Sequence, residues 1–508
     1  MDVQRRPTRY ERDSFYHGLP SRPKLVARSS STPLRLGVDG WSSDRKTLAV
    51  VGKHAIVGKW NEEPSPLRNQ ILGVLSRKNA DWHAVDVLRI GYADEEMPVI
   101  VSISVSAGTA WEVGDAVARD CRRALVEHGL DDVHCEIKES RLADLASVLQ
   151  QDAHQHPPHF HAHMYHLSDR LGTSIASLEQ PRLEGTKGLY LRRADGEPDE
   201  IFSLTCRHVC YHETTGCLLP RQKSLASKPV IQLPEKTTDR LVKALEERKH
   251  EVMERLQTED AKGECYGQDE RERRVNNAAA YRQDMLETDR LLQYFIRRKD
   301  LNTRVFGHVA YASDYAVRTS GFLSDWCLIR LEADSHERRL SELSNRVYIG
   351  PQGLSTLFPR TVRVRDPDRD GTLCIRGVVA VSELQNADRK LTVGMKGRTS
   401  DLQFGLVNQV RSVTRRVWED AGAVVSQECC IVADRVSHAF TQPGDSGACV
   451  FDLEGRAVGM VTGGMTRDDM VRSGDDFGMD RLMDVTYVTP VQWLLEDMKA
   501  CGLAMEIL

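Results

Sequence analysis

A serine between two glycines carries the clearest chemical signal in the sequence. In Gly444-Asp445-Ser446-Gly447 the glycines let the backbone bend tightly around an exposed hydroxyl. A serine hydroxyl is a poor nucleophile until a base takes its proton, and the carbonyl that it attacks then needs donors for its developing negative charge. The backbone amides of Gly444 and Ser446 can supply those donors, so we expect an oxyanion hole there. The residues that follow predict a strand, a hairpin turn at 453–456 and a second strand.

Two other residues have the chemistry that such a serine requires. His208 follows the apolar run 201–205, and Asp325 precedes the apolar run 326–331. A histidine can take the serine proton and return it to the leaving amine. A carboxylate can hold the imidazole in the right tautomer and stabilise the imidazolium. Asp314 is the alternative candidate for the acid.

Together these motifs resemble those of the chymotrypsin-like (trypsin-fold, PA clan) serine proteases. The segment from Thr205 to His208 resembles the family's Thr-x-x-His motif, and Asp325 begins a segment similar to its Asp-x-x-Leu-Ile strand. The order His, Asp, Ser along the chain is also the family's order. The resemblance implies a serine endopeptidase with a His208-Asp325-Ser446 triad, an acyl-enzyme on Ser446, no metal and no cofactor.

Weaker similarities to the family extend over 172–233 and 301–500. Segment 185–190 resembles the opening strand, 396–400 with Gly405 resembles the strand before the substrate pocket, and 486–495 resembles the last strand and closing helix. The resemblance assigns substrate binding to four residues, namely Phe440, Thr462, Gly463 and Gly464. The last three match the edge strand along which a peptide pairs. Phe440 stands at the pocket floor, which predicts a mild preference for apolar or small side chains.

The sequence departs from the family's pattern in two places. Val209 and Cys210 follow His208, whereas the family usually has a cysteine directly after the histidine. No short propeptide with a clear cleavage site precedes residue 172, so we do not expect a freed N-terminus to pair with Asp445. Two alternatives remain for that carboxylate: it pairs with an internal cation, or a partner orders the loop.

The length of 508 residues exceeds what one core holds, since single cores stop growing near ~250–300 residues. The expected fold class is mainly β: two antiparallel six-stranded barrels with a helical-hairpin insertion and an N-terminal α/β domain. The expected domains are a mobile basic arm (1–45), the α/β domain (46–150), a His-rich linker (151–171) and the protease domain (172–500). The insertion (234–300) interrupts the protease domain.

The N-terminal domain is predicted from alternating patterns. Segments 85–90, 99–105 and 133–137 predict strands, and helical spacing between Thr109 and Gly129 predicts a helix. The insertion is predicted to be a helical hairpin, because apolar residues recur at heptad-like or helical spacing among charged residues. The apolar residues are Leu241, Leu245, Val252, Leu256, Val275, Ala278, Met285, Leu292 and Phe295.

Six histidines stand between residues 151 and 170: His154, His156, His159, His161, His163 and His166. A metal site is possible with so many imidazoles, but a structural zinc site usually has Cys/His pairs at fixed spacing. Because no cysteine is near, we favour a solvated linker.

Composition narrows the classes of partner and location. The 69 basic and 74 acidic residues nearly balance, which argues against general nucleic-acid binding. No apolar run reaches ~18 residues and no apolar stretch follows Met1, so neither a membrane span nor a signal peptide is expected. The 12 cysteines form no paired CxxC units and are expected to be reduced. We therefore expect an intracellular, cytoplasmic protein that acts on polypeptides.

Two other interpretations stay open. The chain could be a catalytically inactive or latent protease-fold protein that serves as a protein-binding scaffold, with partners on the N-terminal domain or the helical hairpin. The N-terminal unit or the His-rich linker could also be an inhibitory prosegment that the protein removes by regulated self-cleavage.

Overall fold

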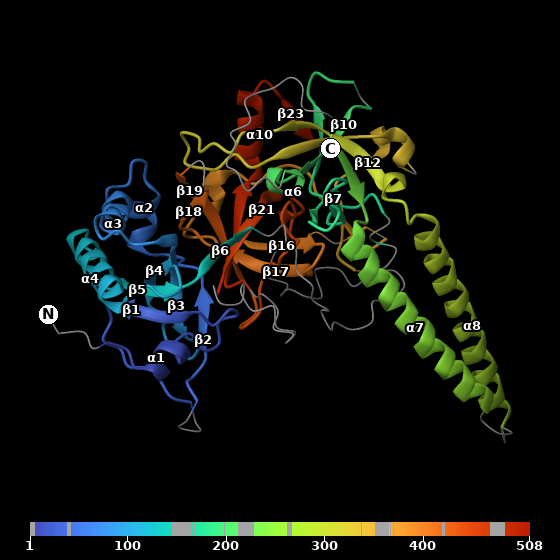
Figure 1. Ribbon diagram of the computed structural model, residues 1–508, viewed down its shortest axis with the longest axis horizontal. Coiled ribbons are helices and arrows are strands. Elements are labelled where there is room, and N and C mark those ends of the chain that lie inside the picture. Colours follow the sequence, from blue (N-terminus) through green and yellow to red (C-terminus); the bar gives the residue numbers. More distant parts are fainter. Residues whose placement is uncertain are drawn as a thin grey trace.

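The computed structural model describes residues 6–37, 42–144, 165, 168–197, 199–211, 228–261, 267–336, 338–350, 365, 367–368, 370–418, 422–467 and 483–508. Within these ranges the chain is mainly β, as the sequence predicted, with a thirteen-stranded, an eight-stranded and a two-stranded sheet (Figure 1). In the same ranges, no helix is long and apolar enough to cross a membrane. The six histidines of the His-rich linker lie outside the described residues.

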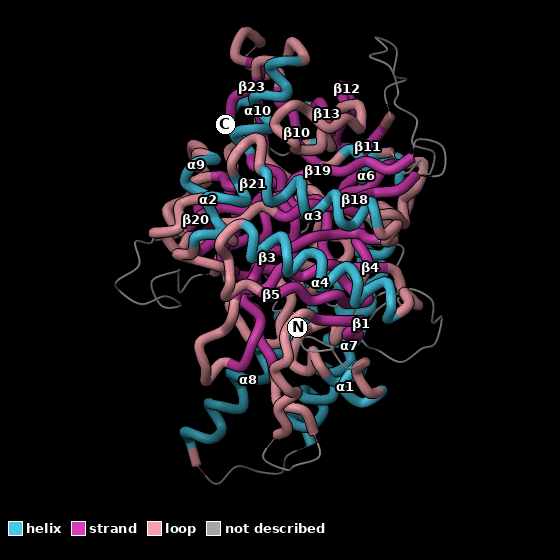
Figure 2. The backbone as a smooth tube through the Cα atoms, turned by 90° about the vertical axis from the view of Figure 1, so that its left-hand side faces the viewer, coloured by secondary structure: helices cyan, strands magenta, loops and turns pink. Residues whose placement is uncertain are grey.

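The N-terminal unit is an α/β layer of strands with helices α2 (Ala55–Asn61), α3 (Pro66–Arg77) and α4 (Trp111–Glu127) on one face and the segment of α1 (Arg9–Ser14) on the other. Its strands are β1 (Lys24–Arg28), β2 (Lys46–Ala49), β3 (Trp82–Tyr92), β4 (Val99–Val105) and β5 (His134–Glu139). Helices α3 and α4 run across β3, β4 and β5 in Figure 2, and the apolar side chains between these layers form one core. The predicted strands and the predicted helix of this unit are all present.

The prediction of a mobile arm over 1–45 is wrong for the described part of that segment. Helix α1 begins after Thr8, whose side chain caps it, and β1 pairs antiparallel with β5. Phe15, Tyr16 and Leu25 are buried in a small core beside the sheet. The arm folds because these few apolar residues cover the sheet, and its Ser-, Pro- and Arg-rich composition concealed them.

The N-terminal sheet continues into the C-terminal half of the chain. Strand β3 pairs with β18 (Ser412–Trp418), where Val85 lies opposite Val413. Beyond β18 come β19 (Gly422–Ala433), β17 (Asp401–Val407), β16 (Thr392–Gly397), β20 (Cys449–Asp452), β21 (Ala457–Thr466) and β22 (Val485–Pro490). A further pairing of β19 with β22 closes these last six strands into a ring. Strand β6 (Arg141–Asp144) pairs with β21 beside this ring.

The eight-stranded sheet lies against this ring. Its order is β23 (Met505–Ile507), β9 (Tyr190–Arg193), β10 (Ile201–Thr205), β13 (Cys327–Leu331), β12 (Val305–Ala312), β11 (Pro229–Gln232), β7 (Ser174–Ser177) and β8 (Gly185–Thr186). Within the described residues its end strands β23 and β8 do not pair, so this sheet differs from the closed six-stranded barrel that the sequence predicted. One continuous core fills the space between ring and sheet, with Phe202, Leu328 and Phe451 among its members.

Short elements complete this part of the chain. Strands β14 (Arg346–Tyr348) and β15 (Thr372–Cys374) form the two-stranded sheet. The short helices are α6 (Arg207–Cys210), α9 (Val381–Leu384), α10 (Val491–Ala500) and the 3-10 turns η1 (Leu301–Arg304), η2 (Ala333–Ser335) and η3 (Leu340–Glu342).

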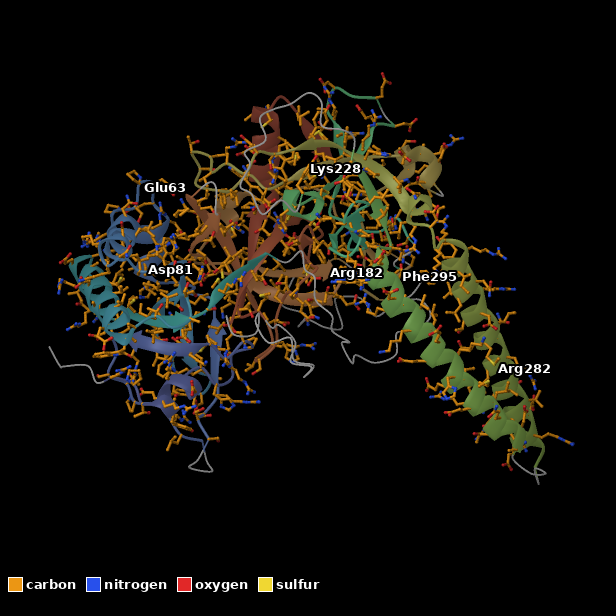
Figure 3. The ribbon with its side chains drawn as sticks, in the orientation of Figure 1. Glu63, Asp81, Arg182, Lys228, Arg282 and Phe295 are labelled. Atoms are coloured by element: carbon orange, nitrogen blue, oxygen red, sulfur yellow. The ribbon has the colours of Figure 1, made fainter. Side chains whose placement is uncertain are left out.

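The helical insertion is present as α7 (Glu235–Ala261) and α8 (Gln268–Arg297), which lie side by side and project away from the sheets (Figure 1). In Figure 3, Arg182 lies beside the root of α7, where it pairs with Glu235, and Arg282 lies far out on α8. Leu245 and Phe295 are buried between the helices near the root. Val275, which the sequence placed in the seam, is 62% exposed, because the outer part of α8 buries few apolar side chains.

Candidate active site

His208 reaches the site from the end of β10. The strand ends at Thr205, and one turn of helix, α6, follows and carries His208. Strand β13 pairs with β10 so that Cys327 lies opposite Thr205. Asp325, two residues before Cys327, therefore lies beside His208. Both side chains are buried.

The structure brings the three predicted residues into one chain of hydrogen bonds. Nδ1 of His208 lies 2.7 Å from Oδ2 of Asp325, and Nε2 lies 2.7 Å from Oγ of Ser446. A carboxylate only accepts, so the proton of the neutral imidazole belongs on Nδ1 and the lone pair of Nε2 faces the serine hydroxyl. His208 is thus placed to remove the proton of Ser446.

Asp325 is held in its charged form. Burial raises the pKa of this carboxyl, but the neighbouring His208 ring and the Arg416 guanidinium outweigh it and hold the pKa below its ordinary value. The backbone N–H of His208 also donates to Oδ1 at 3.2 Å. The alternative acid, Asp314, is partly exposed and pairs with Arg318 at 2.7 Å, so Asp325 is the carboxylate that meets the histidine.

Two glycines in the nucleophile loop, the segment 442–448 that carries Ser446, lie so close to other residues that a side chain would not fit. Gly444 and Gly447 have φ angles of 107° and 91°, in the left-handed region that side chains disfavour. A Cβ on Gly444 would lie 2.4 Å from the Arg398 side chain, and one on Gly447 would lie 2.2 Å from the Thr205 hydroxyl. The loop can therefore pack against both sheets only with glycine at these positions.

The loop presents two unsatisfied backbone donors. The Pro443 carbonyl accepts from the Thr399 hydroxyl at 2.8 Å, and the Asp445 carbonyl accepts from the amide of Ala448 at 3.0 Å. Because a trans peptide points its N–H opposite to its carbonyl, the N–H groups of Gly444 and Ser446 point away from these contacts. Among the described residues, neither N–H has an acceptor. Two buried donors without partners at a nucleophile are what an oxyanion hole provides.

Asp445 anchors this loop through neutral groups. Its carboxylate accepts from the amides of Thr399, Ser400 and Gln442 and from the Ser400 hydroxyl, at 2.5–3.3 Å. Burial raises the pKa of Asp445, and these four donors lower it again in part. In the part of the chain that the structure describes, Asp445 forms no ion pair, so the first of the two alternatives, an internal cation, is not seen there. The turn after β16 supplies most of the donors.

The predicted substrate strand lies on β21, next to the nucleophile. Val461 exchanges two backbone hydrogen bonds with the loop, accepting from Gly447 at 2.9 Å and donating to Ala448 at 3.0 Å. Thr462, Gly463 and Gly464 follow directly on the same strand. Phe440 is buried in the main core, and a Cβ on Gly405 would lie 3.0 Å from its ring. Its assignment to the pocket floor remains a prediction.

Two site residues were missed at the sequence level. Arg416 on β18 and Glu428 on β19 form a buried pair, with 3.5 Å between Nη1 and Oε1. Burial raises the pKa of Glu428 to about 7, although Arg416 lowers it. Neither residue belongs to a motif, and their position behind Asp325 depends on how the β18–β19 hairpin packs. The one sequence signal that could have suggested that Arg416 and Glu428 are buried is their position within segments that alternate like β-strands.

A metal site could in principle use the same groups. The ligand atoms of Cys206, His208 and Asp325 lie within 4.8 Å of one another. However, both ring nitrogens of His208 already have partners, and the Cys206 thiol donates to the Val461 carbonyl at 3.1 Å. All three groups are therefore already engaged in hydrogen bonds, which link Asp325 through His208 to Ser446.

No protein-family model matches the chain, and no curated protein matches it. Several solved structures match the chain weakly, and three of them are serine proteases. A glutamic acid specific serine protease that uses a novel histidine triad in substrate binding has a TM-score of 0.31 and 12% identity, over 67% of this chain and 100% of its own. Thermobifida fusca Protease A has a TM-score of 0.29 and 13% identity, over 67% of this chain and 99% of its own. Cellulomonas bogoriensis chymotrypsin has a TM-score of 0.22 and 17% identity, over 40% of this chain and 75% of its own.

Proposed function

We propose that this protein is a serine endopeptidase of the chymotrypsin-like type that hydrolyses peptide bonds through an acyl-enzyme on Ser446. The observation that carries the proposal is the single imidazole that lies 2.7 Å from both the Asp325 carboxylate and the Ser446 hydroxyl. The sequence motifs around the three residues support the same family. The domain that performs the reaction is residues 172–500, with the helical hairpin inserted.

Acylation follows from the geometry of these groups. Nε2 of His208 takes the proton of Ser446 as Oγ attacks the carbonyl carbon of the substrate. The oxyanion that forms is stabilised by the N–H groups of Gly444 and Ser446. Asp325 stabilises the imidazolium, which then gives its proton to the leaving amine.

Deacylation uses the same groups with water in place of the amine. His208 takes a proton from the water as its oxygen attacks the ester carbonyl, and then returns the proton to Oγ of Ser446. The products are a new carboxylate and the free serine. The substrates are polypeptides that pair with Thr462, Gly463 and Gly464 on β21, and Phe440 favours an apolar or small side chain at the cleaved bond.

Covalent labelling by a fluorophosphonate probe tests the proposal without knowledge of the substrate. We expect the wild-type chain to be labelled at Ser446 and the variant Ser446→Ala to show no labelling. Ser335→Ala, at an exposed serine on η2, is the matched control and should label like the wild type. Labelling that persists in Ser446→Ala would contradict the assignment. A complete lack of labelling in every folded variant would favour the scaffold interpretation.

A further inference from the structure

Arg398 lies between the helical insertion and the nucleophile loop. It follows β16 directly, and its side chain is 11% exposed. Its Nη2 lies 2.5 Å from Oε2 of Glu184, which is fully buried. On the other side, a Cβ on Gly444 would lie 2.4 Å from Nη1 of Arg398. The guanidinium therefore bridges a buried carboxylate and the loop that carries Ser446.

The first turn of α7 holds both Glu184 and Arg398. The backbone N–H of Thr237 donates to Oε1 of Glu184 at 3.0 Å, and the Thr237 hydroxyl donates to Oε2 at 2.6 Å. The first N–H groups of a helix have no partner within the helix, so a carboxylate is favourable there. Nε of Arg398 donates to the Thr237 hydroxyl at 3.4 Å, and Arg240 donates to the Arg398 carbonyl at 3.3 Å. The insertion thus contacts the side chain and the backbone of Arg398.

Several cations meet at the root of α7. Burial and the nearby Arg398 guanidinium lower the pKa of Lys236 to about 8 and the pKa of Arg240 to about 10. The Glu184 carboxylate raises both pKa values again in part, because an opposite charge favours the protonated forms. Loss of the Glu184 charge would leave three cations against one another and would displace Arg398 from the nucleophile loop.

Arg398 also directs two hydroxyl groups towards the nucleophile loop. Its Nη1 donates to the Thr399 hydroxyl at 2.9 Å, and its backbone N–H donates to the Thr186 hydroxyl at 3.2 Å. A hydroxyl that accepts from these groups can turn its own proton to another acceptor. Thr399 donates to the Pro443 carbonyl at 2.8 Å, and Thr186 donates to the Gly444 carbonyl at 2.9 Å. Both peptide groups that meet at Gly444 are held in this way.

The orientation of the peptide group between Pro443 and Gly444 decides whether the oxyanion hole is formed. The N–H of Gly444 belongs to this group and points opposite to the Pro443 carbonyl. Gly444 has a φ angle of 107°, and glycine adopts either sign of φ at little cost, so its own preference does not fix the group. The hydrogen bond from Thr399 to the Pro443 carbonyl therefore favours the orientation in which the N–H faces the oxyanion.

We infer that Arg398 keeps the oxyanion hole beside Ser446 formed and that the first turn of α7 holds Arg398 in place. Arg398 acts through the Thr399 and Thr186 hydroxyls, so it is a positioning residue. The helical insertion is then part of the framework of the active site. The inference rests on the proposed peptidase function and adds the residues that keep its oxyanion donors aligned.

The first experiment compares two arginines at the root of α7 by the rate of fluorophosphonate labelling, divided by the folded fraction of each variant. We expect Arg398→Met to label about ten- to hundredfold more slowly, since complete loss of one oxyanion donor costs about 10²–10³-fold. Arg182→Met is the matched control, because Arg182 pairs with Glu235 on the same turn at 3.2 Å and is exposed (Figure 3). It should label like the wild type. A wild-type rate in Arg398→Met would overturn the inference.

A second variant tests the same contact with a smaller change to the fold. Glu184→Gln keeps the shape of the side chain and removes the charge that Nη2 of Arg398 faces. We expect labelling per folded molecule to slow by about tenfold, from the loss of a charge-assisted hydrogen bond. This variant decides the question if Arg398→Met does not fold, and an unchanged rate would overturn the inference.

The next experiment tests the part of α7. Thr237→Val removes the hydroxyl that lies between Glu184 and Arg398. We expect labelling to slow by about threefold or more, from the loss of neutral hydrogen bonds. Thr258→Val is the matched control on the same helix, since the exposed Thr258 hydroxyl donates to the Glu254 carbonyl at 2.8 Å. Equal rates in Thr237→Val and Thr258→Val would overturn the role of the insertion.

A double variant separates positioning from a general loosening of the fold. If Arg398 acts through Thr399, the variant with both Arg398→Met and Thr399→Val should lose clearly less than the product of the two single losses. A loss equal to that product would overturn this route. Wild-type labelling with no effect of Arg398→Met would leave the proposed function in place. No labelling in wild type and in Arg182→Met would remove the proposed function itself.

Discussion

The Asp325 carboxylate accepts two hydrogen bonds from His208, one from ring Nδ1 at 2.7 Å and one from the backbone N–H at 3.2 Å. The first bond sets the tautomer of the ring. The second ties the carboxylate to the start of α6, the helical turn that carries the histidine. One carboxylate therefore fixes both the position of His208 and the nitrogen that faces Ser446.

Asp325→Asn should abolish most of the activity and leave the fold intact. The amide would donate to Nδ1 and force the imidazole proton onto Nε2, which then cannot accept from Ser446. We expect the rate of fluorophosphonate labelling to fall on the order of 10³–10⁴-fold, as for loss of the correct tautomer in such triads. Asp314→Asn, at the partly exposed alternative acid, is the control and should label at the wild-type rate. Equal losses in both variants would contradict the assignment of the acid.

Asp445→Ala should loosen the nucleophile loop. Its removal leaves the donors on Thr399, Ser400 and Gln442 without an acceptor, and each buried unsatisfied donor costs about 1–3 kcal/mol. We expect the free energy of unfolding to fall by roughly 3 kcal/mol or more in urea titrations, and labelling of Ser446 to fall with it. Ser400→Ala, which removes one donor and keeps the carboxylate, should have a clearly smaller effect. The same loss in the two variants would mean that the carboxylate does not anchor the loop.

Lys187→Met should stabilise the protein at neutral pH. Lys187 is fully buried, and burial lowers its pKa from 10.5 to about 8. Below pH 8 both folded and unfolded chains carry the charge, so the folded state bears the full cost of the buried ammonium. Between pH 8 and 10.5 the folded chain releases its proton first, and the cost shrinks. We expect the variant to gain up to roughly 3 kcal/mol at pH 7 and progressively less as the pH rises. A gain that is independent of pH would show that the charge is not the cause.

Glu428→Gln should change how stability depends on pH. Burial raises the pKa of Glu428 from 4.5 to about 7, so between these values the folded chain holds a proton that the unfolded chain has lost. Wild-type stability therefore falls as the pH rises from 4.5 to 7 through this group. Glutamine has the same shape and no titration, so the variant should gain roughly 2–3 kcal/mol over wild type between pH 5 and 8. Denaturant titrations at pH 5 and pH 8 measure the difference in the free energy of unfolding between variant and wild type. A difference that is the same at both pH values would contradict the shifted pKa.

The three residues of the proposed triad could be predicted because their signals are local. His208 and Ser446 stand in short motifs that contain both the side chain and the backbone that positions it. Asp325 was identified from the strand that follows it, and the structure places it and not Asp314 beside the histidine. The helices of the insertion were predictable for the same reason, since periodicity within one helix requires no knowledge of its partner.

The remaining features depend on contacts between distant segments. Arg141–Asp144 has no strand pattern of its own, and it becomes a strand only because β21 offers an unpaired edge. Arg416 and Glu428 become site residues through the packing of a hairpin. Three of the four donors that hold Asp445 belong to Thr399 and Ser400, which lie 46 and 45 positions earlier in the chain. The first segment was misassigned because three buried side chains outweigh a polar composition.

The pairing of β3 with β18 has a consequence while the chain is being made. The two strands are about 320 residues apart, and synthesis at about 5–20 residues per second leaves the edge of β3 exposed for on the order of 15–60 s. An unpaired edge is a template for foreign strands, and an inward-pointing charge is one device that discourages them. Asp86 on β3 supplies such a charge. In the folded protein Asp86 accepts hydrogen bonds from Ser412 on β18 and Tyr487 on β22. The same carboxylate that discourages foreign strands at the unpaired edge therefore helps to bind β18 when that strand arrives.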